Sequence, residues 1–312
     1  MNDFMICGAL LYDGTGHPPY PADVAVTESR VAAVAPAGKL HRTGFREIRA
    51  DGLSLSPGFI DAHGHSDVSI LAAPEASGKI SQGVTTEITG NCGLSAFPVL
   101  TDEVREHLDN LYAAYHVPIT WSTLDDYATE LNRREPAINI ASLCGHNTLR
   151  ANISGYGGRT LAAAELNRMA ELLGQALHQG AAGLSTGLLY TPGRFADTAE
   201  LLHLMSVLKK FDRLYATHLR SEGDQLTEAL DEAVFLAKNG SRKLQISHLK
   251  TALPRNWDKL DRVLELIRNA QSCGIRLTAD RYPYIRSQTS LSVILPPPYD
   301  AMDDISIRRT LC

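Results

Sequence analysis

The sequence lacks the features that mark several specialised classes of protein. Its 30 lysines and arginines stand against 35 aspartates and glutamates, so the net charge of -5 argues against a nucleic-acid-binding surface. No stretch approaches the roughly 20 apolar residues that a membrane span needs, and the first residues carry no basic leader. We therefore expect a cytoplasmic protein that binds small molecules and neither nucleic acid nor membrane.

Cysteine is also scarce, and its distribution does not predict a disulfide framework. The chain has five, an odd number, at Cys7, Cys92, Cys144, Cys273 and Cys312. Scattered cysteines in a reducing compartment are expected to be free. Cys92, in "TEITGNCGLS" at the end of an apolar run, leaves three interpretations open: a small buried hydrophobe, a catalytic nucleophile or a metal ligand.

The 312 residues are 44% hydrophobic, enough for one large domain with a small appendage. Residues 1–54 alternate short strand-like runs with glycine and proline turns, which predicts a small antiparallel sheet, part of an incomplete β-sandwich. From residue 55 onward, apolar strand-like runs alternate with amphipathic helices, a pattern typical of a parallel α/β sheet. We predict two domains, 1–54 and 55–312.

The larger domain contains about seven segments with the character of parallel strands. They are residues 58–65, 83–90, 138–146, 182–190, 214–219, 243–249 and 275–284. Helices are predicted at 160–179, after Asp197 and around 257–267, and residues 98–136 form a mostly helical insertion. A closed barrel of this type needs eight strands, so the pattern predicts a TIM-type (β/α)8 barrel that lacks its last unit.

Four histidines and one cysteine stand where these strands end. His63 and His65 are two positions apart after the first strand, so their side chains can face the same way. His218 and His248 each follow a short apolar run, and Cys92 follows the second strand. A single histidine there is more often a hydrogen-bonded core residue, but such barrels build their active sites at this edge. Together these residues favour a metal site.

Six segments in order carry a resemblance to a known family: "PGFIDAHGHSD", "GVTTEITGNCGLSAFPV", "GLSTGLLYTPG", "THLRSEGD", "ISHLK" and "DRYPY". They resemble the N-acyl-D-amino-acid deacylases, or D-aminoacylases, of the amidohydrolase superfamily, over essentially the whole chain. The resemblance implies a metal-dependent hydrolase barrel that uses zinc to cleave N-acyl-D-amino acids into a carboxylate and a D-amino acid.

The same resemblance implies a set of metal ligands. Many relatives bridge two metals with a carbamylated lysine on the fourth strand, and residues 182–190 contain no lysine. The D-aminoacylase branch resembles this chain in using the cysteine after the second strand instead. Cys92, His218 and His248 would then hold the tightly bound zinc. His63 and His65 would line a second, weaker position.

Substrate contacts are implied at four positions. Tyr190 matches a family position near the substrate, and Lys250 matches a contact to the substrate carboxylate. Tyr282 and Ser287 would line the pocket. A half-buried structural tyrosine and a solvated lysine are the ordinary alternatives for the first two.

Three further residues would orient the metal ligands: His146, and the pair Arg220 and Glu222 after His218. Ordinary surface ion pairs are the alternative for that pair.

The chain also departs from the family pattern. The family's catalytic aspartate on the eighth strand and a later arginine have no matching segment, and Asp303 and Asp304 follow no apolar strand. No catalytic residue is therefore assigned, although Asp280 or an aspartate in the tail is a possible replacement. We expect a chain truncated at its C-terminus, with little deacylase activity and low stability. A cyclic-amide hydrolase resembling dihydroorotase or hydantoinase, and an inactive metal-binding fragment, are the alternatives.

Overall fold

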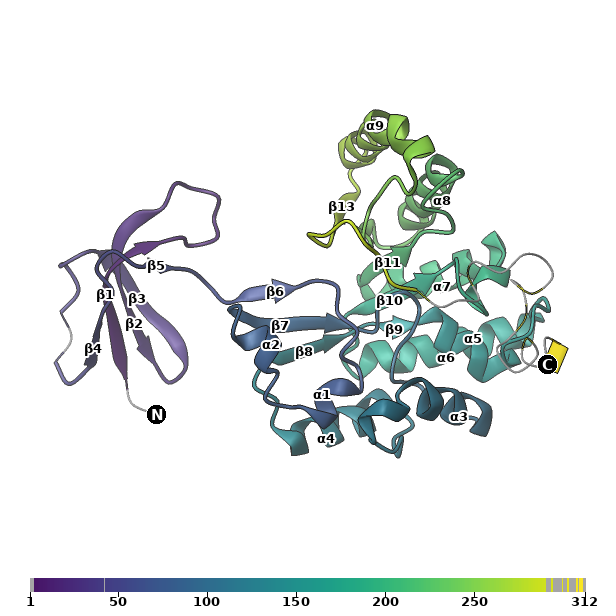
Figure 1. The fold of residues 1–312 in the computed structure, drawn as a ribbon, viewed down its shortest axis with the longest axis horizontal. Coiled ribbons are helices and arrows are strands. Elements are labelled where there is room, and N and C mark those ends of the chain that lie inside the picture. Colours follow the sequence, from purple (N-terminus) through teal and green to yellow (C-terminus); the bar gives the residue numbers. More distant parts are fainter. Residues whose placement is uncertain are drawn as a thin grey trace. The chain divides into compact units, whose positions relative to one another are not determined.

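The computed structural model describes residues 3–41 and 43–289, together with positions 293, 299, 302, 307, 309 and 310. The chain forms two compact units, Met1–Phe59 and Ile60–Cys312 (Figure 1). The domain boundary after residue 54 stays a prediction.

The first unit is built on one five-stranded sheet. β1 (Phe4–Leu11), β2 (Tyr20–Thr27) and β3 (Arg30–Pro36) pair in antiparallel fashion, as the sequence predicts. β4 (Arg46–Arg49) and β5 (Ser54–Leu55) pair in parallel with β1, so the sheet is mixed. The prediction of an antiparallel sheet is wrong for these two strands, because β4 begins beside the start of β1. The described residues of this unit form a single sheet. That this sheet is part of an incomplete β-sandwich stays a prediction.

The second unit contains all seven predicted strand segments, and the third is divided in two. One sheet has the order β6 (Phe59–Asp61), β7 (Val84–Thr89), β8 (Asn139–Ser142). The other has the order β13 (Arg276–Ala279), β12 (Lys243–Ile246), β11 (Leu214–His218), β10 (Gly183–Gly187), β9 (Cys144–Gly145). β7 is parallel to β8, and neighbouring strands from β9 to β13 are also parallel.

The two sheets meet at Leu143, which lies between β8 and β9 and donates its backbone N–H to Thr89 at 2.9 Å. Consecutive strand segments are thus neighbours from β6 to β13, an arrangement typical of α/β proteins with right-handed crossovers. No pairing between β6 and β13 is found in the described residues, so closure into a barrel is not shown.

Helices connect and cover these strands. They are α1 (Ser69–Ala72), α2 (Ser77–Ile80), α3 (Asp102–Leu111), α4 (Leu124–Arg134), α5 (His146–Ser154), α6 (Ala163–His178), α7 (Thr198–Phe211), α8 (Leu226–Asn239) and α9 (Leu260–Ser272), with 3-10 turns η1 (Ala113–Tyr115), η2 (Gly193–Phe195) and η3 (Pro254–Lys259). The helices predicted from residues 160–179, after Asp197 and around 257–267 are confirmed. So is the helical character of the insertion.

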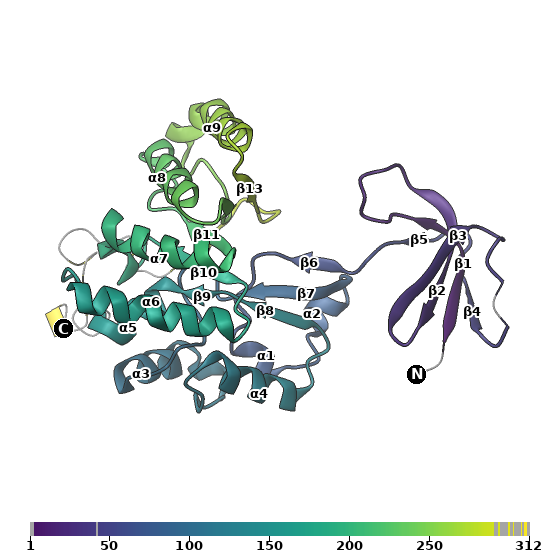
Figure 2. The ribbon, with the colours of Figure 1, turned by 180° about the vertical axis from the view of Figure 1, so that it is seen from behind.

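The core of the second unit lies between the parallel strands and their helices. α7, α8 and α9 contact β11, β12 and β13 respectively, and successive helices also contact one another (Figures 1 and 2). The apolar stripe of α6 is buried at Met169, Leu173 and Leu177, as its periodicity predicts. Among the described residues, no helix combines the length and apolar composition that a membrane crossing requires.

This packing gives a direct test of the core. Leu204 on α7 is fully buried, whereas Leu264 on α9 is 38% exposed. We expect Leu204→Ala to lower the free energy of unfolding by about 2–5 kcal/mol, because a cavity remains where the side chain was. The matched control Leu264→Ala should change it by only about 0.5 kcal/mol. Urea denaturation followed by circular dichroism measures both, and equal losses would contradict the placement of these helices.

Candidate metal centre

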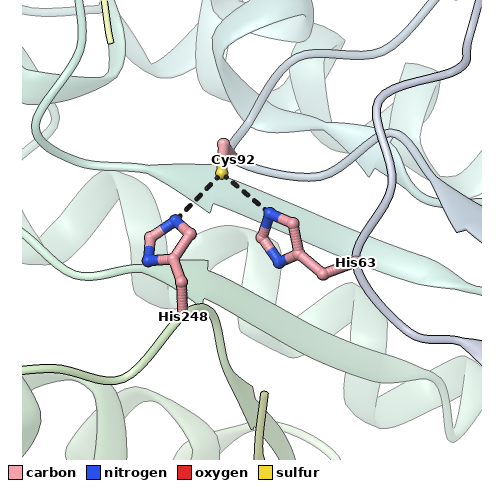
Figure 3. Close-up of side chains that lie close together, drawn as sticks. All are labelled: His63, Cys92 and His248. Atoms are coloured by element: carbon pink, nitrogen blue, oxygen red, sulfur yellow. Dashed lines mark hydrogen bonds between the residues drawn. The ribbon is translucent and has the colours of Figure 1, made fainter. Parts of the chain in front are cut away.

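Four side chains of types that can bind a metal ion converge from the ends of four strands. Because parallel strands run in one direction, residues that follow them meet at one edge of the sheet. His63 follows β6, Cys92 follows β7, His218 ends β11 and His248 follows β12. Figure 3 shows Cys92 between the rings of His63 and His248. The Cys92 Sγ atom lies 3.4 Å from His63 Nε2 and 3.5 Å from His248 Nε2.

These separations fit a shared metal ion. Zinc–sulfur and zinc–nitrogen bonds of about 2.3 and 2.0–2.1 Å in a tetrahedron place the two ligand atoms about 3.6 Å apart. His63, Cys92 and His248 offer ligand atoms that all lie within 4.8 Å of one another. The donor set, one thiol and two imidazoles, is one that zinc prefers. The residues present therefore fit a zinc ion at this position.

The backbone around two of these residues is unusual. Cys92 and His248 have φ angles of 55° and 36°, in the left-handed region that most residues avoid. Such conformations persist only where the surroundings enforce them, and they concentrate at functional sites. Next to Cys92, Gly93 also has a positive φ, and a Cβ atom there would overlap the Asn147 side chain. The loop carrying Cys92 is thus held by close packing.

The turn that carries His63 and His65 is held in a similar way. Gly64 donates its N–H to the carbonyl of Ile88 on β7 at 2.9 Å. A Cβ atom at Gly64 would overlap the carboxylate of Glu87, which is itself fully buried on β7. Only glycine allows the turn to lie this close to the neighbouring strand.

The surroundings of Cys92 bear on its three possible roles. The side chain is 5% exposed, and burial together with the charges of Glu222 and Asp280 raises the pKa of its thiol well above the usual range. A nucleophilic cysteine needs a lowered pKa, so this environment argues against that role. A bound dication ionises a coordinating thiol, so the same environment is compatible with a metal ligand.

His218 has the properties of an available ligand. Its side chain is 3% exposed, and within the described part of the chain neither ring nitrogen has a hydrogen-bond partner. Burial lowers the pKa of His218 to about 3, which keeps the ring neutral. Its ring centroid lies 4.4 Å from that of His248, and the two form a second potential metal-binding group with Glu222.

His65 lies outside both groups. Its side chain is exposed, and its ring centroid is 5.2 Å from that of His63. The structure thus groups Cys92 and His248 with His63, and His248 with His218. The division into a tight and a weak metal position stays a prediction.

Two carboxylates that sequence reasoning did not place as ligands lie beside these histidines. Glu222 Oε1 is 2.6 Å from His248 Nδ1, and it also contacts Lys250 Nζ. Although burial opposes its ionisation, the hydrogen bond from His248 and the nearby charges lower the pKa of Glu222 to about 2. The prediction that Glu222 lies near the ligands agrees with this contact, whereas Arg220 forms an ion pair with Glu232 at 2.9 Å.

Asp280 contacts both His63, which follows β6, and His248, which follows β12. Its Oδ1 accepts the backbone N–H of His248 at 2.6 Å, and its Oδ2 lies 3.4 Å from His63 Nδ1 and accepts from Gln245 at 2.7 Å. Burial opposes ionisation, but these contacts hold the pKa of Asp280 below its usual value. The sequence suggests Asp280 only as a possible replacement for the missing catalytic aspartate, and its position after the seventh strand puts it at the same edge as the histidines.

The predicted substrate contacts lie partly around this group. The Tyr190 ring packs edge-on against His218 with centroids 4.7 Å apart, and burial raises the pKa of Tyr190 to about 12. Lys250 Nζ lies 5.6 Å from the centre of the Tyr282 ring. Ser287 is exposed. Asp303 and Asp304 lie outside the described residues. Roles in substrate binding stay predictions.

His146 belongs to a different cluster from the one the sequence suggested. Its Nε2 lies 2.7 Å from Glu200 Oε1, and Arg150 Nε lies 3.1 Å from the same oxygen. All three side chains are buried, between α5 and α7. The backbone N–H of Glu200 donates to Asp197 Oδ1 at 2.8 Å, which caps the start of α7, while the Glu200 side chain takes part in this cluster. His146 therefore stabilises the packing of two helices.

The fold and this group of side chains define an α/β protein with a candidate metal centre at its strand ends. Residues 46–285 match the family model described as the amidohydrolase family. The chain belongs to the amidohydrolase family and, within that superfamily, to the D-aminoacylases.

Three relatives illustrate the similarity. An N-acyl-D-aspartate deacylase of Alcaligenes xylosoxydans xylosoxydans is 37% identical over 290 residues, 93% of this chain and 57% of the relative. The structure of an N-acyl-D-glutamate deacylase from Bordetella bronchiseptica, complexed with zinc and a phosphonate mimic of the tetrahedral intermediate, has 35% identity and a TM-score of 0.83, covering 91% of this chain and 59% of that one. A D-aminoacylase with a binuclear metal centre has 34% identity, a TM-score of 0.82 and the same coverage. The chain thus spans less than two thirds of the length of these relatives.

The placement of His146 leads to a prediction that separates stability from metal binding. We expect His146→Ala to lower the free energy of unfolding by about 1.5–3 kcal/mol, because Glu200 loses a charge-assisted hydrogen bond. Zinc content should not change, because His146 contacts Glu200 and not the grouped metal-binding side chains. Urea denaturation and elemental analysis measure the two effects. A drop in zinc content with unchanged stability would instead support the sequence-based prediction that His146 orients the metal ligands.

Proposed function

We propose that this chain carries the zinc centre of an N-acyl-D-amino-acid deacylase, which hydrolyses the amide bond to give a carboxylate and a D-amino acid. The observation that carries the proposal is the grouping of His63, Cys92 and His248. The Cys92 Sγ atom lies 3.4 and 3.5 Å from the Nε2 atoms of His63 and His248, close to the separation of two ligand atoms on one zinc ion. The zinc-bound N-acyl-D-glutamate deacylase, at 35% identity, supports both the metal and the substrate class.

In this proposal, Cys92 and His248 are the ligands on which the centre is built. The spacing of Cys92 from His63 supports His63 as a neighbouring ligand. His218 is neutral and its ring nitrogens have no hydrogen-bond partner in the described residues, which supports His218 as a further ligand next to His248. His65 keeps its predicted place at the second, weaker position.

When bound, zinc lowers the pKa of a coordinated water to about 7 and polarises an amide carbonyl. The chain's own residues bind and orient the substrate around it. Tyr190 keeps its phenolic proton at neutral pH, since its pKa is about 12, and can donate a hydrogen bond to the amide carbonyl or the carboxylate. Lys250 would bind the α-carboxylate, with the Tyr282 ring beside its ammonium group. No described residue is assigned the proton transfer to the leaving nitrogen.

The zinc ligands give a test with a matched control. Cys92→Ala removes the thiol from the group, whereas Cys144→Ala removes a fully buried thiol from β9 that belongs to neither metal-binding group. Elemental analysis of the purified wild-type protein should show close to stoichiometric zinc. We expect zinc content to fall sharply in Cys92→Ala and to stay unchanged in Cys144→Ala. Full zinc content in Cys92→Ala would mean that the ligand assignment is wrong.

The proposed substrate class gives a second test. We expect the zinc-loaded protein to bind N-acetyl-D-amino acids more tightly than their L enantiomers, and any deacylation to show the same preference, because the relatives it resembles are named for D substrates. Deacylation and calorimetric affinity should be measured with paired N-acetyl-D- and N-acetyl-L-methionine, with dihydroorotate as a cyclic control. Equal responses to the enantiomers, or turnover of dihydroorotate alone, would place the chain with a different activity.

A further inference from the structure

One carboxylate oxygen in the candidate metal centre serves two partners with different predicted roles. Glu222 Oε1 lies 2.6 Å from His248 Nδ1 and is also in contact with the Lys250 ammonium group. All three side chains are largely shielded, with exposed fractions of 16%, 12% and 13% for Glu222, His248 and Lys250. A shared, shielded carboxylate ties the position of one partner to that of the other.

The first contact decides which His248 nitrogen carries the proton. Two acceptor atoms would repel each other at 2.6 Å, so Nδ1 must donate to Glu222 Oε1. The lone pair of His248 is then on Nε2, the atom that faces Cys92 at 3.5 Å. Lys250 Nζ also lies within hydrogen-bond distance of Nδ1, at 3.1 Å, and a bond from this ammonium group would need a lone pair on Nδ1. The shorter contact with Glu222 Oε1 assigns the proton to Nδ1 instead, so the two nitrogens are donors that meet on one oxygen.

The same distance argues against Glu222 as a direct ligand beside Nδ1. Nitrogen and oxygen ligands of one tetrahedral zinc lie about 3.3 Å apart, given bonds of about 2.0–2.1 Å. The observed 2.6 Å between Glu222 Oε1 and His248 Nδ1 is a hydrogen-bond distance. A carboxylate that accepts from the outer nitrogen of a ligating histidine is a common device for orienting the ring.

The second contact of Glu222 is with the ammonium group of Lys250, which would bind the substrate carboxylate. Lys250 already has an anionic partner in Glu222, so a substrate carboxylate must share or replace that partner. Glu222 also places a like charge near the incoming anion, which opposes its binding. The two contacts of Glu222 therefore act in opposite directions on zinc and on substrate.

We propose that Glu222 is a positioning residue with two effects: it orients His248 toward the metal, and it competes with the substrate carboxylate for Lys250. This inference rests on the proposed function and adds to it a residue that sets the balance between metal affinity and carboxylate affinity. As a consequence, a substrate binds Lys250 only if its carboxylate can displace the carboxylate of Glu222.

The test uses Glu222→Gln, which preserves the shape of the side chain and removes its charge. Zinc affinity, measured by competition with a chromophoric chelator, should fall by about 10- to 100-fold, the usual effect of losing such an orienting carboxylate. The matched control is Glu232→Gln, because Glu232 on α8 is paired with Arg220 and not with a predicted ligand. That control should leave zinc affinity unchanged.

The second measurement separates competition from a general effect on the site. At saturating zinc, calorimetry compares N-acetyl-D-methionine with its C-terminal amide, which lacks the carboxylate. In Glu222→Gln the acid should bind on the order of 10-fold more tightly than in the wild type, because an anionic competitor is gone, while the amide should bind unchanged. Adding Lys250→Gln to this variant should abolish the gain.

Several results would overturn the proposal. Unchanged zinc affinity in Glu222→Gln would show that Glu222 does not orient His248. Loss of one whole zinc equivalent, with normal affinity for what remains, would make Glu222 a ligand. Equal gains for acid and amide would show that it does not compete for Lys250. Failure of the proposed function is distinguishable, since it appears in the wild type as absence of zinc or as equal binding of acid and amide.

Discussion

The common direction of the strands is the constraint on which the site depends. Because β7 is parallel to β8 and neighbouring strands from β9 to β13 are parallel, the residues that follow these strands reach one edge of their sheet. Residues as distant in sequence as Cys92 and His248 then need only a short, well-held turn to meet. Both adopt left-handed backbone conformations, so the turns are shaped by packing and not by local preference. The sheet thus brings these side chains to one edge, and the loops fix their exact positions.

The sequence predicted the strands well because buried parallel strands are apolar throughout and stand out between amphipathic helices. It could not predict the interruption at Leu143, where one apolar run divides between two sheets. Nor could it predict that β4 and β5 pair in parallel with β1. Short strands with similar alternation look alike in sequence, and their direction of pairing depends on the path of the connecting chain.

The same contrast holds within the site. The positions of the strand ends were enough to predict that Cys92 and the histidines lie at one edge, but not that His63 is grouped with Cys92 and His248. The ion-pair partners of the charged residues were harder to predict, because they depend on which residues are neighbours in the folded structure. Arg220 pairs with Glu232, twelve positions away, and His146 pairs with Glu200 across two helices. Periodicity along one element contains no information about such pairs.

The charges around the centre point to a cation as the natural completion of the site. Glu222 and Asp280 are both held in their ionised forms, with Lys250 as the neighbouring positive group. His218 is neutral, since its pKa is about 3. Cys92 keeps its proton because burial and the two carboxylates oppose a further negative charge. A dication reverses that last balance, because it compensates the carboxylates and stabilises the thiolate together. The features that make Cys92 inert as a nucleophile thus make it a suitable ligand.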